Sequence, residues 1–246
     1  MKKFFGFIAA CSLLFTSCLS DSEATGQLWG YFTVENNTNE VILHMDGGGT
    51  YYPTSSSVYE LTDGKGFGSV KRCTFYLTYP ESGLTKDSDG MPIARNVTIN
   101  SGEEVYTINA LTPTAAEAQN IYANDSINEV TSLQSLWIYN GYLTTVYQTK
   151  YYSRSSASVY PTLNLVIAEG ENGGEINATL LLNLHHQDDK DVLSTTTVNL
   201  AKSFDISSFG YEFQKFGSDS VTVNIKCRGI NDYSFKVAAK EAFHRF

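Results

Sequence analysis

The 246-residue chain is poor in charge and in cysteine. Charged residues make up 17% of it, which excludes a coiled coil or a long charged helix, and four cysteines are too few for a disulfide-dense scaffold. Lys and Arg number 17 against 26 Asp and Glu, so the net charge is −9. A chain of this sign is a poor partner for nucleic acid, because phosphate binding needs clustered cations.

Motifs for catalysis and metal binding are also missing. No His-Glu-x-x-His and no Gly-x-Ser-x-Gly sequence occurs. His185 and His186 are followed by acidic residues, but two adjacent strand residues point to opposite faces, so a polar turn is the interpretation we prefer over a metal site. The segment 87–90, Asp-Ser-Asp-Gly, begins like a calcium loop, yet Thr98 stands where that loop needs a bidentate Glu. We therefore predict no catalytic residue, no metal and no cofactor.

The N-terminus is the most informative segment that is present. Lys2 and Lys3 precede a mostly apolar run from Phe4 to Phe15, which is long enough for a signal peptide and too short to span a bilayer. Small residues then lead to Cys18, as in a lipoprotein signal. We predict a lipoprotein signal peptide over residues 1–17 and lipidation of Cys18. The alternative is an ordinary signal peptide that is cleaved elsewhere.

A short polar tether follows over residues 18–26. Its acidic residues after Cys18 resemble the surface-export signals of lipoproteins from Gram-negative anaerobes, although a solvated tether would have the same composition. The protein is thus expected to be an outer-membrane lipoprotein that faces either the periplasm or the cell surface. No other stretch approaches 18 apolar residues, so the lipid would be the only membrane attachment.

The rest of the chain has the pattern of an all-β protein. Aromatic residues make up 13% of it, and short alternating runs are separated by turn sequences. The clearest run spans 70–79, where apolar Cys73, Phe75, Leu77 and Tyr79 share one face. Further runs lie at 27–34, 41–45, 96–99 and 103–110. Five or six short strands within about 85 residues predict a small OB-like barrel over residues 27–111.

The strand pattern breaks and then resumes. Residues 112–126 contain a Thr-Pro-Thr turn and an Ala-rich helical turn, and we predict a linker there. Regular strands return at 133–152, with a turn or bulge at Gly141, and continue at 160–168, 176–186, 192–200, 221–227 and 233–237. This spacing predicts a β-sandwich over residues 127–246.

Several segments resemble the NigD-like lipoproteins. They are the lipidated Cys18 with its tether, the sequence Trp-Ile-Tyr-Asn-Gly-Tyr-Leu-Thr at 137–144, the leucine-rich strand with a His and acidic end at 180–189, and Ser-Phe-Asp-Ile-Ser at 203–207. The resemblance implies an N-terminal OB-like domain followed by a C-terminal β-sandwich. It also implies a link to bacteriocin immunity, through the operon for which the family is named. It provides no catalytic residues.

Three further groups of residues remain open. Cys73 and Cys227 would be the cysteines of the mature domains, and they either form a disulfide or stay as buried free thiols, the latter being preferred because they fall in different domains. Ser126 and Ser220, each after an Asp and before an apolar residue, match an acceptor for O-glycosylation and fall in predicted connections. Aromatics at 51–52, 139–152 and 209–216 could stack on sugars, although strands are commonly rich in aromatics.

Taken together, these features favour a non-enzymatic, lipid-anchored binding protein of the cell envelope. Its partners would be the membrane, through the lipid, and an unidentified envelope protein or glycan. The main alternative is an accessory glycan-binding lipoprotein of a carbohydrate-uptake system. An aromatic row on one exposed sheet face would favour glycan binding, and carboxylates converging in a deep cleft would favour a hydrolase.

We predict that Cys18→Ala releases the protein from the membrane fraction, because it removes the acceptor of the lipid. Fractionation of cells that express the native and the variant protein measures this. A variant that still sediments with membranes after a high-salt wash would show that Cys18 is not the anchor.

Overall fold

The computed structural model describes residues 23–38, 40–122, 130–154, 157–170, 175–183, 192–214, 220–238 and 242–243. The chain divides into two compact units, Met1–Glu104 and Val105–Phe246, and each contains its own hydrophobic core. The structure is nearly all β, which confirms the predicted fold class. Within the described ranges no helix is long and apolar enough to cross a membrane.

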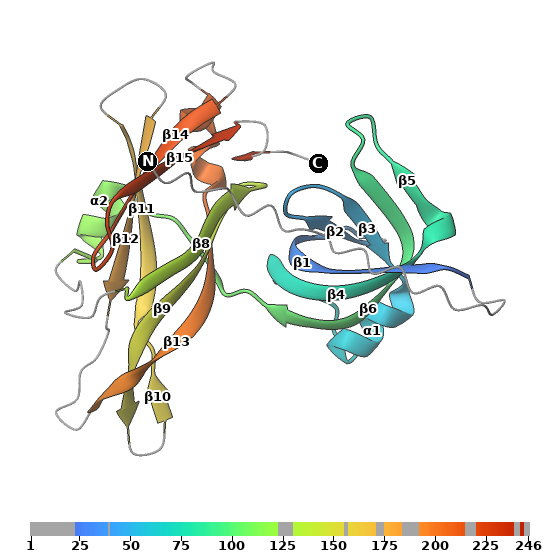
Figure 1. The fold of residues 1–246 in the computed structure, drawn as a ribbon, viewed down its shortest axis with the longest axis horizontal. Coiled ribbons are helices and arrows are strands. Elements are labelled where there is room, and N and C mark those ends of the chain that lie inside the picture. The colour runs from blue at the N-terminus through green and yellow to red at the C-terminus, as the bar shows by residue number, and fades with distance from the viewer. Residues whose placement is uncertain are drawn as a thin grey trace, which may run out of the picture. The chain divides into compact units, whose positions relative to one another are not determined.

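The first unit is a barrel of five strands (Figure 1). Its strands are β1 (Thr25–Asn36), β2 (Val41–Met45), β3 (Thr50–Pro53), β4 (Arg72–Pro80) and β6 (Pro92–Glu104). They follow the order β3-β2-β1-β4-β6, and a parallel pairing of β3 with β6 closes the ring. The short strand β5 (Leu84–Lys86) extends the sheet beside β6. This arrangement confirms the predicted OB-like barrel.

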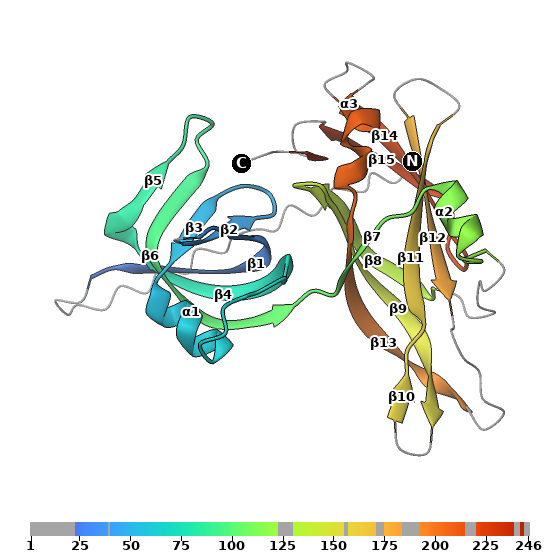
Figure 2. The same ribbon diagram turned by 180° about the vertical axis from the view of Figure 1, so that it is seen from behind.

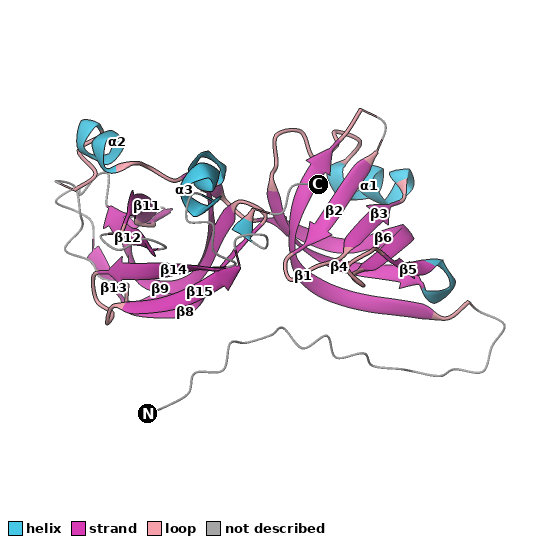
Figure 3. Cartoon of the chain, turned by 90° about the horizontal axis from the view of Figure 1, so that it is seen from above, coloured by secondary structure: helices cyan, strands magenta, loops and turns pink. Residues whose placement is uncertain are grey.

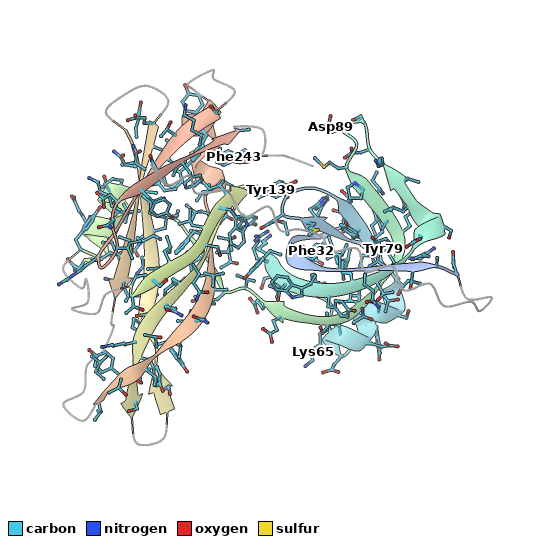
Figure 4. The ribbon with its side chains drawn as sticks, in the orientation of Figure 1. Phe32, Lys65, Tyr79, Asp89, Tyr139 and Phe243 are labelled. Carbon is cyan, nitrogen blue, oxygen red and sulfur yellow. The ribbon has the colours of Figure 1, made fainter. Side chains whose placement is uncertain are left out.

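Successive side chains of β4 point alternately into the barrel core and outward. Cys73, Phe75, Leu77 and Tyr79 are all buried, as predicted from their shared face. Phe75 packs against Phe32 from β1 with ring centroids 5.6 Å apart. Figure 4 labels Phe32 and Tyr79 inside the barrel. Aromatic rings thus supply much of the apolar area that this small barrel buries.

A helix that was not predicted, α1 (Ser55–Thr62), joins β3 to β4 and lies against β6 (Figure 3). Thr54 caps it by accepting a hydrogen bond from the Ser57 backbone N–H. The Ser57 hydroxyl in turn accepts a 2.7 Å hydrogen bond from the Ile99 N–H of β6. Serine has only modest helix propensity, so the helix forms here because its cap and its contacts with β6 stabilise it.

The second unit is a β-sandwich. One sheet contains β7 (Thr107–Asn109), β8 (Ser132–Tyr139), β9 (Tyr142–Arg154), β10 (Ala157–Val159) and β13 (Val192–Asp205). The other contains β11 (Thr162–Glu169), β12 (Glu175–Asn183), β14 (Ser220–Cys227) and β15 (Tyr233–Ala238). Residues of both sheets join one core, including Leu143, Leu165 and Phe204. The expected sandwich is therefore present.

Short helices accompany the sandwich: α2 (Pro113–Ala118) and α3 (Gly210–Gln214), with 3-10 turns at Ser207–Phe209 and, in the barrel unit, at Glu81–Gly83. Figure 2 shows α2 beside β11 and β12. A buried amide pair attaches the chain after α2 to this sheet. Asn164 donates to Asn183, which donates to the Ile121 carbonyl, both at 2.7 Å.

The units divide earlier than the sequence indicated. The predicted barrel ended at residue 111 and a linker followed to 126, but the division falls between Glu104 and Val105. β7 pairs with β13, and Leu111 bridges to Val166 of β11. The segment 105–118 is therefore part of the sandwich. Local sequence could not show this, because the partners of β7 and Leu111 lie some 55 to 100 residues away.

A two-residue turn joins β8 to β9. Tyr139 pairs with Tyr142, and both residues between them have positive φ, 51° at Asn140 and 77° at Gly141. This is the geometry of a type I′ turn, for which Asn-Gly is the preferred sequence. Gly141 also accepts a 2.8 Å hydrogen bond from the Ile206 N–H. The turn predicted at Gly141 is confirmed, and it holds the hairpin to the end of β13.

We predict that Gly141→Ala lowers the free energy of unfolding by about 1 kcal/mol, because alanine is strained at this φ. Urea unfolding measures the change, followed by the fluorescence of Trp137 in a Trp29→Phe background. Asn140→Gly is the matched control, since glycine accepts the same turn. If the free energy of unfolding of Gly141→Ala equals that of Asn140→Gly, the turn does not depend on positive φ at Gly141.

Candidate functional site

The outer wall of the barrel carries an exposed aromatic pair. Trp29 of β1 lies directly opposite Tyr76 of β4, and their side chains are 60% and 36% exposed. Ser101 of β6 is the next residue in the same row. Around this row lie amide and hydroxyl side chains. We name these residues the Trp29 face: Gln27, Trp29, Tyr76, Thr78, Asn100 and Ser101.

Hydrogen bonds and ring contacts orient the Trp29 face. The Tyr76 hydroxyl donates to Gln27 Oε1 at 2.6 Å, and the Asn100 amide donates to Thr78 Oγ1 at 2.8 Å. Trp29 packs edge-on against Tyr31, with ring centroids 5.6 Å apart. Asn100 lies where the register of β6 against β4 shifts between Tyr76 and Leu77, a β-bulge that turns an extra side chain outward. The face is therefore largely pre-ordered.

The alternation of side chains along β1 and β4 could have identified the outward residues of this face. Their meeting across neighbouring strands could not be predicted. Gln27 and Trp29 alternate with Gly26 and Leu28 along β1, and Tyr76 is on the polar face of β4. Which strands become neighbours, and in which register, depends on barrel closure. Trp29 and Tyr76 were therefore not predicted to form a pair.

Most of the described aromatics at 51–52, 139–152 and 209–216 are buried. Tyr51, Tyr147, Tyr152, Phe209 and Phe213 are all buried. The ordinary enrichment of aromatics in strands accounts for them. Tyr52, Tyr139 and Tyr151 are half-buried, and Tyr211 is 74% exposed.

Two charged pairs lie on the outer side of the barrel. Arg72, on the outward side of β4, is buried and forms an ion pair with Asp46. It also donates a 2.9 Å hydrogen bond to Thr33. His44 Nε2 lies 2.8 Å from Glu35 Oε2 on the neighbouring strands. These pairs hold β2 against β1 and connect β4 to the turn after β2.

The acidic loop at 87–90 is a hairpin turn. The Asp87 carboxylate accepts hydrogen bonds from the backbone N–H groups of Asp89 and Met91, at 2.9 and 2.8 Å. Figure 4 labels Asp89 at the end of this hairpin. Within the described residues no group of three or more His, Cys, Asp or Glu could hold a metal. His185 and His186 lie outside those residues.

The two cysteines of the folded units are free. Cys73 belongs to the barrel core and Cys227 to the sandwich core, and both are buried. Burial, together with the nearby Glu104, raises the pKa of Cys73 to about 12, although Arg72 opposes the shift. The disulfide alternative is thus wrong for this structure, because each thiol is enclosed in a different core.

The remaining predicted sites are placed only in part. Cys18 and Ser126 lie outside the described residues. Ser220 was predicted to lie in a connection. It is instead the half-buried first residue of β14, where it pairs with Ala238. Modification of either serine stays a prediction.

The Ser-Phe-Asp-Ile-Ser segment has a structural role in the sandwich. Phe204 and Ile206 are fully buried. Between them, the Asp205 carboxylate accepts hydrogen bonds from the N–H and hydroxyl of Ser207, at 2.9 and 2.6 Å. The Ile206 N–H donates to the Gly141 carbonyl. The segments 137–144 and 203–207, both of which resemble the NigD-like lipoproteins, therefore meet here and stabilise one corner of the sandwich.

Lys202 is a buried cation beside that segment. Its ammonium lies 4.9 Å from the centroid of the Tyr106 ring and 5.8 Å from that of Phe204. Its side chain is 4% exposed, and burial lowers the pKa of Lys202 to about 8. Cation–π attraction compensates only part of the cost of removing the charge from water.

An open polar depression of about 450 Å³ lies on the second sheet of the sandwich. Asn177 and Asn224 line it and are joined by a 3.2 Å hydrogen bond, with Glu175, Lys226 and Asp232 around them. The depression is not a deep cleft, so it does not have the form that would favour a hydrolase.

Comparison with known proteins shows the fold. No protein-family model and no curated protein matches the sequence. Among solved structures, a protein of unknown function, DUF1344, from Bacteroides vulgatus ATCC 8482 is 16% identical with a TM-score of 0.53, covering 86% of this chain and 90% of its own. A protein from Bacteroides fragilis NCTC 9343, provisionally described as a lipoprotein, is 10% identical with a TM-score of 0.52, covering 88% and 99%.

A NigD-like immunity protein from Bacteroides caccae ATCC 43185 is also a structural neighbour, at 14% identity and a TM-score of 0.47, covering 87% of this chain and 93% of its own. The kind of protein named from the sequence motifs is thus found among the neighbours. The first two likenesses extend over both units, so they show that the barrel-plus-sandwich fold is shared.

We predict that Lys202→Met makes stability less dependent on pH. Because the folded state holds the pKa near 8 rather than 10.5, it binds fewer protons than the unfolded state between these values. The penalty for burying the charge is complete below pH 8 and is relieved as the pH rises. Native stability should gain about 2 kcal/mol from this group between pH 7 and 9.5, and the variant should lack that gain.

Urea unfolding at a series of pH values measures the difference between the native and variant proteins. Lys236→Met is the control, because the Lys236 side chain is exposed on β15. A difference that stays constant over this pH range would show that Lys202 is not desolvated.

Proposed function

We propose that this protein is a lipid-anchored binding protein of the cell envelope, attached through Cys18 to the outer membrane of a Gram-negative bacterium. The observation that carries the binding role is the Trp29 face. Exposed rings among oriented amides and hydroxyls are suited to holding a ligand, and they include no nucleophile paired with a base. The protein is accordingly proposed to bind rather than to catalyse.

The anchored location is supported by the N-terminal signal. The B. fragilis protein provisionally described as a lipoprotein shares the fold over most of both chains, which agrees with this location. A lipid tether would also keep the binding unit close to envelope partners and raise its effective concentration there.

The ligand of the Trp29 face is proposed to be a glycan. This was the alternative in the sequence analysis, and the aromatic row on one exposed sheet face is the feature that favours it. A protein partner, as in bacteriocin immunity, remains the competing candidate through the NigD-like resemblance. An immunity role would need a contact surface for a toxin or for its target.

Deletion of the gene separates these roles. A glycan role predicts slower growth on one polysaccharide with unchanged sensitivity to bacteriocins, and complementation with a Trp29→Ala variant should fail to restore that growth. An immunity role predicts the reverse. Turnover of a substrate by purified protein, abolished by one carboxylate or His substitution, would contradict the proposed binding function.

A further inference from the structure

We propose that the Trp29 face binds neutral glycans and discriminates against anionic ones. This inference rests on the proposed binding function and names the site, the chemical class of ligand and the residue that sets the selectivity. Three features carry it: the platform of rings, the unused hydrogen-bonding groups around that platform, and the charge at its edge.

The rings form a platform for a sugar. Directly opposed residues on neighbouring strands have their Cβ atoms about 5 Å apart, so the Trp29 and Tyr76 side chains leave the outer wall side by side. A pyranose presents C–H groups on its face and hydroxyls on its rim. An exposed aromatic ring can bury the C–H face while leaving the rim in contact with polar groups.

Hydrogen-bond donors and acceptors that suit sugar hydroxyls surround that platform. Tyr76 occupies the Gln27 carbonyl oxygen, which leaves the amide N–H₂ of Gln27 as a donor. Asn100 uses its N–H₂ on Thr78, which leaves its carbonyl oxygen as an acceptor. Ser101 adds a hydroxyl that can do either. Sugar hydroxyls both donate and accept, so they match this mixed set.

The same hydrogen bonds lower the entropic cost of binding. The Gln27, Tyr76 and Asn100 side chains are held by their partners before any ligand arrives, and Trp29 is packed against Tyr31. Less side-chain freedom is then lost on association. Placement on strands rather than on loops fixes the spacing of these groups as well.

The charge of the face selects for a neutral ligand. None of the six residues that define it is Lys or Arg. Glu103 of β6 is exposed two residues beyond Ser101, about 7 Å along the strand, and it brings a negative charge to the edge. Arg72, on the outward side of β4, is buried against Asp46. Uronate or sulfate groups would therefore meet repulsion without a compensating cation.

A protein partner fits the face less well. The core of a protein interface is contiguous and largely apolar. On this wall Trp29 and Tyr76 stand among Gln27, Thr78 and Asn100, and no Leu, Ile or Val is part of the face. Isolated rings among hydroxyls and amides are better matched to a ligand that is itself covered with hydroxyls.

The experiment applies full-length protein, purified in detergent, to an array of neutral and anionic glycans, with calorimetry on the neutral oligosaccharides that bind. We expect neutral glycans to bind, Trp29→Ala to weaken them by roughly tenfold or more, and Trp29→Phe to restore part of the loss. Tyr76→Phe should weaken binding less than Tyr76→Ala, because it keeps the ring and loses only the hydrogen bond to Gln27.

Tyr59→Ala and Tyr211→Ala are the matched controls, since both remove exposed tyrosines that are not part of the Trp29 face and should leave affinity unchanged. Glu103→Gln should improve the binding of anionic relative to neutral glycans. The proposal is overturned if no neutral glycan binds, if Trp29→Ala binds as well as the native protein, or if anionic glycans bind preferentially.

These outcomes are separate from those that test the proposed function. Loss of membrane attachment in Cys18→Ala and the growth phenotypes are measured in cells. If the protein is anchored and protects against a bacteriocin but binds no glycan, the glycan ligand proposed above and the inference both fail. If it binds anionic glycans preferentially and Trp29→Ala abolishes that binding, only the inference fails.

Discussion

The barrel wall depends on a single strand, β6, which pairs on both of its sides. Its antiparallel ladder with β4 places Ser101 beside Tyr76, and its parallel ladder with β3 closes the ring. Closure pairs each of the five barrel strands on both sides and commits it to one register, while β5 stands at the edge beside β6. The bulge at Asn100 is part of that register, and it adds an amide to the row of rings. The places of Asn100 and Ser101 in the Trp29 face therefore follow from how β6 is paired, and the β1–β4 ladder sets Trp29 against Tyr76.

The contrast between the two sides of this wall explains why the rings stay available. The inner side is filled by Phe32, Phe75 and other aromatics, whose burial stabilises the barrel. On the outer side, the buried Arg72 forms an ion pair with Asp46. Removing either partner would leave a buried charge uncompensated, which is strongly destabilising. The pair thus reinforces the barrel without adding free positive charge to the face.

The sandwich is stabilised differently. Its two sheets are joined at one side by the segment that begins the unit. β7 pairs with β13 in one sheet, and Leu111 exchanges two 2.9 Å hydrogen bonds with Leu165 and Ile167 in the other. Lys202 is buried next to this segment, with its ammonium over the rings of Tyr106 and Phe204. The described surface of this unit carries a second aromatic pair, Tyr151 and Tyr160, with ring centroids 5.5 Å apart. Its polar depression combines amides with charges of both signs.

The sequence by itself determined the class of protein. Alternation in segments such as 70–79 identified the strands and their buried faces, because a strand repeats every two residues whatever its partners are. The Asn-Gly pair identified a turn, since few other dipeptides accept two positive φ angles. Tertiary structure decided the rest: the end of the barrel at Glu104, the helix after Thr54, and the meeting of Trp29 with Tyr76. Each of these depends on contacts between residues far apart in the chain, and local periodicity contains no information about which strands become neighbours.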